Sequence, residues 1–467
     1  MARIVIMGGG PAGYEAALVA AQHGSDVTVV ERDGMGGACV LDDCVPSKTF
    51  ISSAGIRVDL HRAPELGLVA DRKAVAVDLP TVNQRVKSLA LAQSADVRAR
   101  VEREGVRIIR GTATFGGESV PGAVHTVHAE TADGGHEALP ADVVLIATGA
   151  TPRVLDDAHP DGERILTWRQ LYDLTELPEH LVVVGSGVTG AEFVSAYVEM
   201  GARVTLVSSR DRVLPGEDAD AAAVLQDVFA DRGVEILAQA RADSVRREGD
   251  GVVVTLSDGR TVSGSHALMT VGSVPNTGDL GLDKIGVEIG RGGFIPVDRV
   301  SRTAVPGVYA AGDCTGVMML ASVAAMQGRI AMWHALGEGV APIKLKTVAA
   351  AVFTRPEIAT VGISQKAIDA GEVPARTIML PLSTNPRAKM QGLRRGFVKL
   401  FCRPATGVVI GGVVVAPVAS ELILPIAMAV QNGLSVADLA HTFSVYPSLS
   451  GSITEAARQL MRHGDLD

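Results

Sequence analysis

The 467-residue chain has few cysteines, few aromatic residues and no basic stripe. Its four cysteines, Cys39, Cys44, Cys314 and Cys402, are too few for a disulfide scaffold and suit a reducing compartment. Aromatic residues make up only 3%, so the core must be built mainly from Ala, Val, Leu and Ile. The formal net charge of −9 argues against a nucleic-acid partner, because such proteins usually carry basic patches.

The chain also lacks the uninterrupted apolar run that a membrane span needs. One long apolar stretch, Gly407–Val430, is broken by Pro417, Glu421 and Pro425. This pattern predicts a strand followed by a buried helix, with no membrane span. The first residues, Met1–Met7, predict a buried strand rather than a secretory signal, so we expect a cytoplasmic protein.

Glycine, by contrast, is plentiful at 52 residues, and one cluster of it follows the first predicted strand. The strand Arg3–Met7, a helix over Tyr14–His23 and a strand over Val27–Val30 form a βαβ unit. Its turn is Gly8-Gly9-Gly10-Pro11-Ala12-Gly13. The first glycine permits a tight turn, the third lets a pyrophosphate approach the backbone, and Gly13 lets helix and strand pack closely. Glu31 ends the second strand, where a carboxylate suits a ribose diol, so the unit predicts a dinucleotide site.

The same unit recurs later in the chain and indicates an internal duplication. The strand Leu181–Val184 leads into Gly185-Ser186-Gly187-Val188-Thr189-Gly190, then a helix through Met200 and a strand over Val204–Val207. No carboxylate stands at the ribose position; Ser208, Ser209, Arg210 and Arg212 follow instead. Serine and arginine can accept a 2′-phosphate, which predicts tolerance of, or preference for, NADPH. Alternatively the arginines are solvated loop charges, and NADH binds equally well.

Two cysteines lie just after the first unit, in the segment Gly36–Lys48. Four residues separate Cys39 from Cys44, and both are expected on the first turns of a helix. There they can form a disulfide beside a bound cofactor. The alternative is a pair of buried free thiols. After Lys346 the pattern changes: residues 347–402 are strand-rich, and helices are predicted near Glu421–Asn432 and Ile453–Arg462.

These motifs together resemble the pyridine nucleotide-disulfide oxidoreductases, the flavoprotein family of dihydrolipoamide dehydrogenase, glutathione reductase and mercuric reductase. The resemblance covers essentially the whole chain and rests also on Ala147–Arg153, Gly307–Asp313 and Phe353–Glu357. It implies an α/β fold with two Rossmann-like dinucleotide-binding domains, for FAD and NAD(P), and an α+β C-terminal dimerisation domain. The expected boundaries are 1–150 (FAD-binding, first part), 151–275 (NAD(P)-binding), 276–345 (FAD-binding or central, second part) and 346–467 (homodimer interface).

The resemblance also implies roles for single residues. Lys48 would lie near flavin N5 and pair with Glu192, unless that pair is purely structural; Cys44 would be the thiol nearest the flavin and Cys39 the exchange thiol. Asp313 would bind the ribityl chain. The expected FAD contacts are Gly8, Gly10, Pro11, Ala12, Gly13, Glu31, Arg32, Gly37, Ala38, Lys48, Ala113, Thr148, Gly149, Gly312, Asp313, Leu320 and Ala321. The expected NAD(P) contacts are Gly185, Gly187, Val188, Thr189, Gly190, Glu192, Ser208, Ser209, Arg210 and Gly272.

The chain departs from the family at the acid–base pair. Members that exchange dithiols use a histidine before a proline, backed by a glutamate, from the partner subunit. Here Tyr446 and Gly451 stand at those positions. The only other histidines after residue 345, His441 and His463, do not match the spacing. Loss of a general acid–base costs about 10²–10⁴-fold in rate, so turnover of a disulfide substrate should be slow.

We therefore expect an FAD-dependent NAD(P)H:quinone oxidoreductase of the diaphorase type, because a quinone needs no thiol exchange. Val188 is small where some relatives place a tyrosine. Its small size leaves the nicotinamide pocket open to a flat acceptor; alternatively, Val188 simply packs the turn. The alternatives are a dihydrolipoamide dehydrogenase-like enzyme with impaired acid–base chemistry, a soluble transhydrogenase, and a non-enzymatic flavoprotein subunit. The intact Lys48, Glu192 and Asp313 weigh against the last of these.

Overall fold

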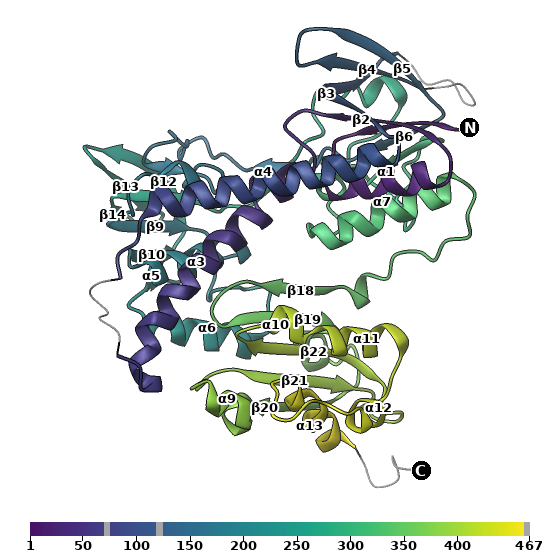
Figure 1. The fold of residues 1–467 in the computed structure, drawn as a ribbon. Coiled ribbons are helices and arrows are strands. Elements are labelled where there is room, and N and C mark those ends of the chain that lie inside the picture. Colours follow the sequence, from purple (N-terminus) through teal and green to yellow (C-terminus); the bar gives the residue numbers. More distant parts are fainter. Residues whose placement is uncertain (70–74, 118–124, 462–467) are drawn as a thin grey trace.

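The computed structural model describes residues 1–69, 75–117 and 125–461, and contains three large sheets flanked by helices (Figure 1). A seven-stranded sheet lies at the N-terminal end of the molecule, and a five-stranded sheet forms a second layered unit beside it. A further five-stranded sheet is built from the C-terminal part of the chain. The α/β fold class expected from the sequence is confirmed.

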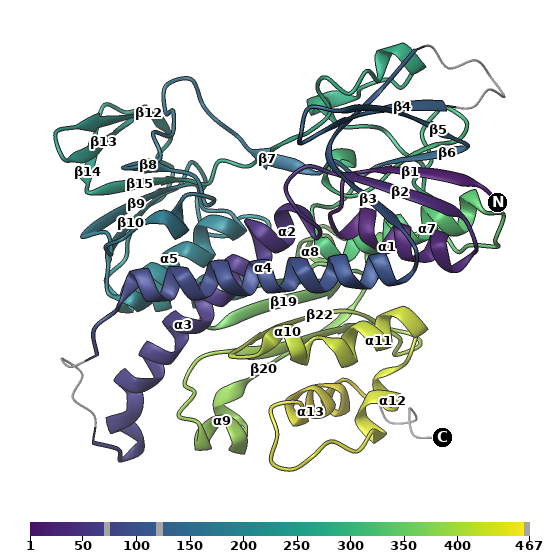
Figure 2. The same ribbon diagram turned by 45° about the horizontal axis from the view of Figure 1, so that its top comes forward.

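The seven-stranded sheet has the order β17-β6-β1-β2-β3-β4-β5. Its first five strands in that order pair in parallel, and β4 and β5 add an antiparallel hairpin. Helices α1 and α7 lie side by side against it (Figures 1 and 2). The bounds are β1 Arg3–Met7, α1 Pro11–Gln22, β2 Asp26–Glu31, β3 Arg107–Phe115, β4 His125–Thr131, β5 His136–Ala141, β6 Val143–Ile146, β17 Val308–Ala310 and α7 Ala321–Ala335.

The second unit repeats this layout with a parallel sheet in the order β11-β10-β9-β15-β8. A three-stranded antiparallel sheet, β12 to β14, and a two-stranded link, β7 with β16, are attached to it. The bounds are β7 Ala150–Pro152, β8 Ile165–Leu166, β9 His180–Val184, α5 Val188–Met200, β10 Arg203–Val207, α6 Ala219–Asp231, β11 Glu235–Leu237, β12 Ala242–Glu248, β13 Gly251–Leu256, β14 Thr261–Gly264, β15 His266–Met269 and β16 Ser273–Pro275.

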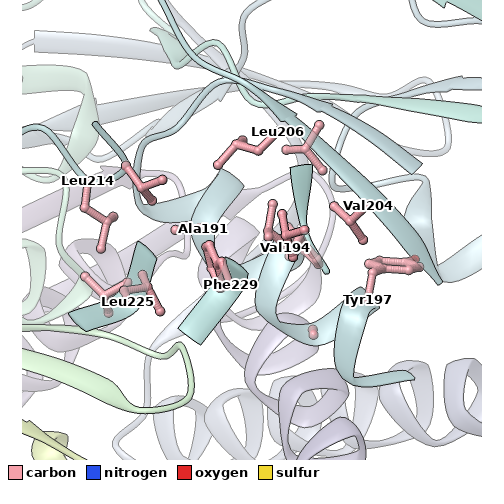
Figure 3. Close-up of a cluster of buried hydrophobic side chains, with 14 of the residues drawn as sticks. Ala191, Val194, Tyr197, Val204, Leu206, Leu214, Leu225 and Phe229 are labelled. Atoms are coloured by element: carbon pink, nitrogen blue, oxygen red, sulfur yellow. The ribbon is translucent and has the colours of Figure 1, made fainter. Parts of the chain in front are cut away.

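The core of the second unit is aliphatic, with a few aromatic rings. Figure 3 shows Val194 and Tyr197 of α5 beside Val204 and Leu206 of β10, with Phe229 of α6 packed next to them. All five side chains are buried. These contacts pack α5 and α6 against β10, and α5 also contacts β9, the strand that precedes its glycine turn.

The C-terminal part forms an antiparallel sheet in the order β18-β19-β22-β21-β20, with helices packed on it (Figure 1). Helices α2, α3 and α4 lie between β2 and β3 in the chain, and α3 packs against α5 of the second unit. The bounds are α2 Gly37–Leu41, α3 Cys44–Arg62, α4 Leu79–Arg103, β18 Ala349–Val352, β19 Glu357–Gly362, α8 Gln365–Asp369, β20 Arg376–Pro381, α9 Pro386–Met390, β21 Phe397–Cys402, β22 Val409–Ala416, α10 Ala419–Leu422, α11 Leu424–Asn432, α12 Val436–His441 and α13 Gly451–Leu460.

The structure differs from the expected elements at three places. Helix α1 begins at Pro11, three residues before the expected Tyr14, because proline is well suited to the first helical position. Cys39 and Cys44 lie on two successive helices, α2 and α3, and not on one. Helix α12 was not expected; it begins after Ser435, which forms a capping box with Asp438.

The apolar stretch Gly407–Val430 forms the expected strand, β22, but the expected buried helix is instead two helices, α10 and α11, and α11 exposes Leu424 and Met428. Among the residues that the structure describes, no helix has both the length and the apolar character required to cross a membrane.

Candidate active site

The first glycine turn is shaped by close backbone contacts. Gly8 has a φ of 107°, and a Cβ there would collide with the carbonyl oxygen of Ala147. A Cβ on Gly13 would collide with the carbonyl oxygen of Gly8. Gly10, in contrast, faces open space with no atom within 4 Å of a Cβ position. Two glycines are therefore required by packing, and the third leaves room for a ligand at the N-terminus of α1.

Glu31 lies at the end of β2 with its carboxylate already oriented. Its Oε2 accepts a hydrogen bond from the Gly9 N–H at 2.6 Å, and its Oε1 accepts one from the Asp33 N–H at 2.7 Å. The carboxylate therefore sits beside the glycine turn, as a ribose-binding acid must.

A cavity of about 690 Å³ opens at this turn, within the range of about 300–1,000 Å³ typical of small-molecule and cofactor sites. Most of the residues expected to contact FAD line it. Those residues are Gly8, Gly10, Pro11, Ala12, Glu31, Arg32, Gly37, Ala38, Ala113, Thr148, Gly149, Gly312, Asp313 and Ala321, together with Cys39 and Cys44. Gly13, Lys48 and Leu320 do not line it; Gly13 packs under the turn, Lys48 lies in an ion pair and Leu320 immediately precedes α7.

The cavity wall also contains residues that the sequence did not indicate, among them Asp43, Trp168, Arg169 and Asn276. Asn276 and Thr148 clamp one side: Thr148 Oγ1 donates to the Asn276 carbonyl at 2.7 Å, and Asn276 Nδ2 donates to the Thr148 carbonyl at 2.9 Å. Arg169 forms an ion pair with Asp42 at 3.2 Å. The Arg169–Asp42 pair joins the second unit to the segment that carries the two cysteines. These wall residues approach the Thr148-Gly149 motif only in the folded structure. No local sequence pattern could therefore have identified them.

Cys39 and Cys44 are free thiols that share a hydrogen bond. Cys44 is the first residue of α3, where the helix N-terminus favours a thiolate. The hydrogen bond from Cys39, and then Lys48, lower the pKa of Cys44 against the opposing effects of burial and Asp43. The same hydrogen bond, together with burial, raises the pKa of Cys39. Cys44 therefore ionises more readily than Cys39.

Lys48 and Glu192 form an ion pair across two units of the chain, as expected. Lys48 Nζ lies 2.9 Å from Glu192 Oε2, and the Glu192 side chain is only 4% exposed. Glu192 Oε1 also accepts a hydrogen bond from the Phe353 N–H at 2.9 Å. Burial lowers the pKa of Lys48, but Glu192, Cys44 and Asp43 raise it by more, so its pKa is raised overall. Lys48 therefore stays charged through neutral and mildly alkaline pH.

Two further carboxyl groups face the cavity. Burial, and then the neighbouring Asp43, raise the pKa of Asp313 to about 6. Burial also raises the pKa of Asp43, against the effect of Lys48. Asp313 and Asp43 are therefore two carboxyl groups of the cavity wall that are reluctant to ionise.

The second glycine turn repeats the geometry of the first. Gly185 has a φ of 115°, and a Cβ there would collide with the carbonyl oxygen of Thr270, while Gly187 faces open space. A Cβ on Gly190 would collide with the carbonyl oxygen of Gly185. Val188, the first residue of α5, is 43% exposed. The turn therefore leaves the N-terminus of α5 open to a second nucleotide.

The residues at the second ribose position differ in their exposure. Ser208 is fully buried, and its hydroxyl shares a hydrogen bond with Ser186 at 2.7 Å. The Arg212 guanidinium donates to the carbonyls of Pro215 and Glu217. Ser209 and Arg210 are exposed. Of this group, Ser209 and Arg210 are therefore the two whose side chains remain accessible to a nucleotide, and Ser208 supports the turn.

The acid–base positions carry no acid or base. Tyr446 is 82% exposed and precedes a cis peptide bond to Pro447. Gly451 is the first residue of α13. His441 ends α12 and is exposed, whereas His463 falls outside the described residues.

Comparisons with known proteins agree with this geometry. A family model described as "Pyridine nucleotide-disulphide oxidoreductase" matches residues 2–328, and the family's dimerisation-domain model matches residues 348–457. A Mycobacterium tuberculosis protein named "NAD(P)H dehydrogenase (quinone)" is 66% identical over 469 residues, covering 100% of this chain and 95% of that protein. A Haloarcula marismortui "Dihydrolipoyl dehydrogenase 2" is 34% identical, covering 97% and 95%. The crystal structure of LpdA from Mycobacterium tuberculosis matches with a TM-score of 0.95 at 64% identity, covering 99% of this chain and 100% of that one.

Proposed function

Because the chain belongs to the pyridine nucleotide-disulphide oxidoreductase family, we propose that it passes hydride from NAD(P)H through FAD to a quinone-type acceptor. Its cofactors are FAD and a nicotinamide nucleotide. The acceptor is suggested by the 66%-identical relative, which is named a quinone dehydrogenase. The domain assignment follows the family: residues 1–150 and 276–345 bind FAD, 151–275 bind NAD(P), and 346–467 form a homodimer.

The observation that carries the proposal is that the acid–base positions that would serve Cys39 hold Tyr446 and Gly451. A dithiol–disulfide exchange requires an ionised exchange thiol and a base to receive its proton. Here the pKa of Cys39 is raised, and Tyr446 and Gly451 stand where a histidine and a glutamate would act. The Lys48–Glu192 pair and the cavity are nevertheless intact. The chain therefore keeps the residues for flavin reduction and lacks those for disulfide turnover.

The cavity fits FAD on three independent grounds. Gly10 leaves space beside the N-terminus of α1, whose free N–H groups suit a pyrophosphate. Glu31 supplies an oriented acceptor for the ribose diol. Asp313 lines the same cavity and can accept hydrogen bonds from the ribityl hydroxyls. The remaining expected contacts, including Gly13, Lys48, Leu320 and Ala321, are assigned on the family pattern.

When bound, FAD accepts hydride from the nicotinamide and returns electrons to the acceptor. In this proposal Lys48 provides a fixed positive charge beside the reacting ring, and its partial burial strengthens the effect. Glu192 holds Lys48 in place from the helix that follows the second glycine turn. Cys44 lies nearest the flavin, and Cys39 keeps the proton that exchange would have to remove.

We further propose that NADPH is used at least as well as NADH. Ser209 and Arg210 are exposed at the second ribose position and can bind a 2′-phosphate without a competing carboxylate. The contacts assigned to this nucleotide are Gly185, Gly187, Val188, Thr189, Gly190, Glu192, Ser209, Arg210 and Gly272, with Ser208 shaping the turn.

A homodimer is supported by the dimerisation-domain match and by exposed apolar side chains on that domain. Phe443, Val445 and Tyr446 are respectively 102%, 78% and 82% exposed, and Leu424 and Met428 are also exposed. An exposed apolar group of this kind marks an interaction surface.

The four free thiols suit a cytoplasmic location.

The experiment that tests the proposal restores the missing pair. Gly451 has room for a side chain, because the nearest atoms to a Cβ are the hydroxyls of Ser444 and Ser448 at 3.7 Å. We expect the double variant Tyr446→His/Gly451→Glu to raise lipoamide reduction about 100-fold or more, within the usual range for a general acid–base. Quinone reduction should stay unchanged. Tyr446→Phe is the matched control and should alter neither activity.

A further inference from the structure

A second cavity, of about 760 Å³, lies away from the cofactor site. It is enclosed by the C-terminal half of α3, the end of α6, the loop that follows α9 and the turn before β19. It shares no lining residue with the first cavity. The reaction proposed above therefore makes no use of it.

Cations outnumber anions on its wall. Five arginines line it (Arg62, Arg232, Arg355, Arg394 and Arg395), against three carboxylates (Asp59, Glu65 and Asp231). Glu199 compensates one more charge, because it pairs with Arg232 at 2.6 Å behind the wall. Among the lining residues and Glu199, one positive charge remains in excess. Burial, helped by Arg355 and Arg395, lowers the pKa of Arg232 despite that pairing.

Two of these arginines have unused donors. Arg394 is exposed and forms no hydrogen bond or ion pair with any described residue. Arg395 pairs with Asp231 at 2.6 Å through Nη2, but its Nη1 is buried and lacks a partner within the described part of the chain. A buried charged donor without a partner is costly. Adjacent guanidinium groups offer the forked donors that phosphate oxygens fit.

We propose that this cavity binds a small organic phosphate with an apolar body. The phosphate would lie on Arg394 and Arg395, since its charge of about −1.5 to −2 and three acceptor oxygens match two guanidiniums. The apolar body would lie against Leu66, Val228 and Leu393, which line the same cavity.

The cavity is connected to the proposed active site through one face of α5. The Arg355 N–H donates to Ser195 Oγ at 3.1 Å, and Ser195 Oγ donates to Glu199 Oε1 at 3.0 Å. Two residues before Arg355, the Phe353 N–H donates to Glu192 Oε1 at 2.9 Å. Ser195 lies one turn from Glu192 on this helix. Because Arg355 also lines the cavity, we expect a bound ligand to alter these contacts and so to change the rate of flavin reduction.

The test is titration calorimetry on the FAD-loaded full-length protein, with NADP⁺ saturating the nucleotide site. The probes are octyl phosphate, inorganic phosphate, octanoate and octanol. We expect one octyl phosphate per chain, bound more tightly than inorganic phosphate, with octanol giving no binding. Arg394→Gln should weaken octyl phosphate binding about 10–100-fold, as for loss of a charge-assisted contact.

Arg387→Gln is the matched control, since Arg387 is exposed on α9 and does not line the cavity. It should bind as wild type does. Because Arg394 has no internal contact, its variant should keep the wild-type melting temperature. Unchanged binding in Arg394→Gln, or no binding because a second copy covers the cavity in the dimer, would overturn the proposal. Equal binding of octanoate would overturn the phosphate assignment, and binding without any change in the rate of flavin reduction by NADPH would overturn the connection to Glu192.

Discussion

The Glu192→Gln substitution tests what the Lys48–Glu192 pair contributes to stability and to flavin reduction. Glutamine keeps the shape of the side chain but loses its charge. Its NH₂ group must then face either Lys48 Nζ or the Phe353 N–H, and because both of these are donors, one of the two 2.9 Å hydrogen bonds is lost. Loss of one charge-assisted hydrogen bond in a buried site costs about 1.5–3 kcal/mol. We expect the free energy of unfolding to fall by about that amount.

The same loss should appear in the chemistry if the pair orients Lys48 toward the flavin. At about 1.4 kcal/mol for each tenfold in rate, flavin reduction by NADPH should slow about 10–100-fold. The assay is anaerobic rapid mixing with NADPH, followed by the bleaching of flavin absorbance.

Glu15→Gln provides the control for stability. Glu15 is also buried and pairs with Arg329 at 2.7 Å, but it does not line the cofactor cavity. This variant should lose comparable stability and keep the wild-type rate of reduction. Wild-type bleaching in Glu192→Gln, at full flavin content, would show that the pair is purely structural and refute the reasoning.

Three further predictions concern other parts of the site. The pKa of Asp313 is raised to about 6, so ionisation of this carboxyl opposes folding. The free energy of unfolding of the FAD-free protein should therefore fall by about 3 kcal/mol as pH rises from about 4 to 7. In denaturant unfolding, Asp313→Asn should remove this pH dependence. Cys39→Ser should leave steady-state quinone reduction within about 2-fold of wild type, since no acid–base step passes through this thiol; a large loss would place it in the electron path. Arg210→Gln should raise the KM for NADPH about 10-fold and leave that for NADH unchanged, as expected for one contact to a 2′-phosphate, and equal effects on both nucleotides would contradict that role.

The sequence alone was sufficient for features that depend on local backbone geometry. Both glycine turns could be predicted, because a positive φ at Gly8 and Gly185 and the close contact at Gly13 belong to the tight strand-to-helix turn of the dinucleotide-binding fingerprint. Helix α12 was also accessible in principle, since Ser435 and Asp438 have the spacing of a capping box.

The rest of the site depends on contacts between distant segments. Asn276 lies 128 positions from Thr148, and Arg169 reaches Asp42 from a different unit of the chain. Neither contact leaves a periodic or local signal. Similarly, the sequence placed Ser208 at the ribose position but could not indicate that its hydroxyl is satisfied by Ser186, which leaves Ser209 and Arg210 as the accessible pair.

The central claim is that electrons leave this protein to a quinone and not through disulfide exchange. The most direct measurement compares steady-state NADPH oxidation by the FAD-loaded wild-type protein with a naphthoquinone and with lipoamide, at equal enzyme concentration. We predict a kcat/KM at least about 100-fold higher for the naphthoquinone, in line with the absent general acid–base. Lipoamide turnover as fast as quinone turnover would contradict the account.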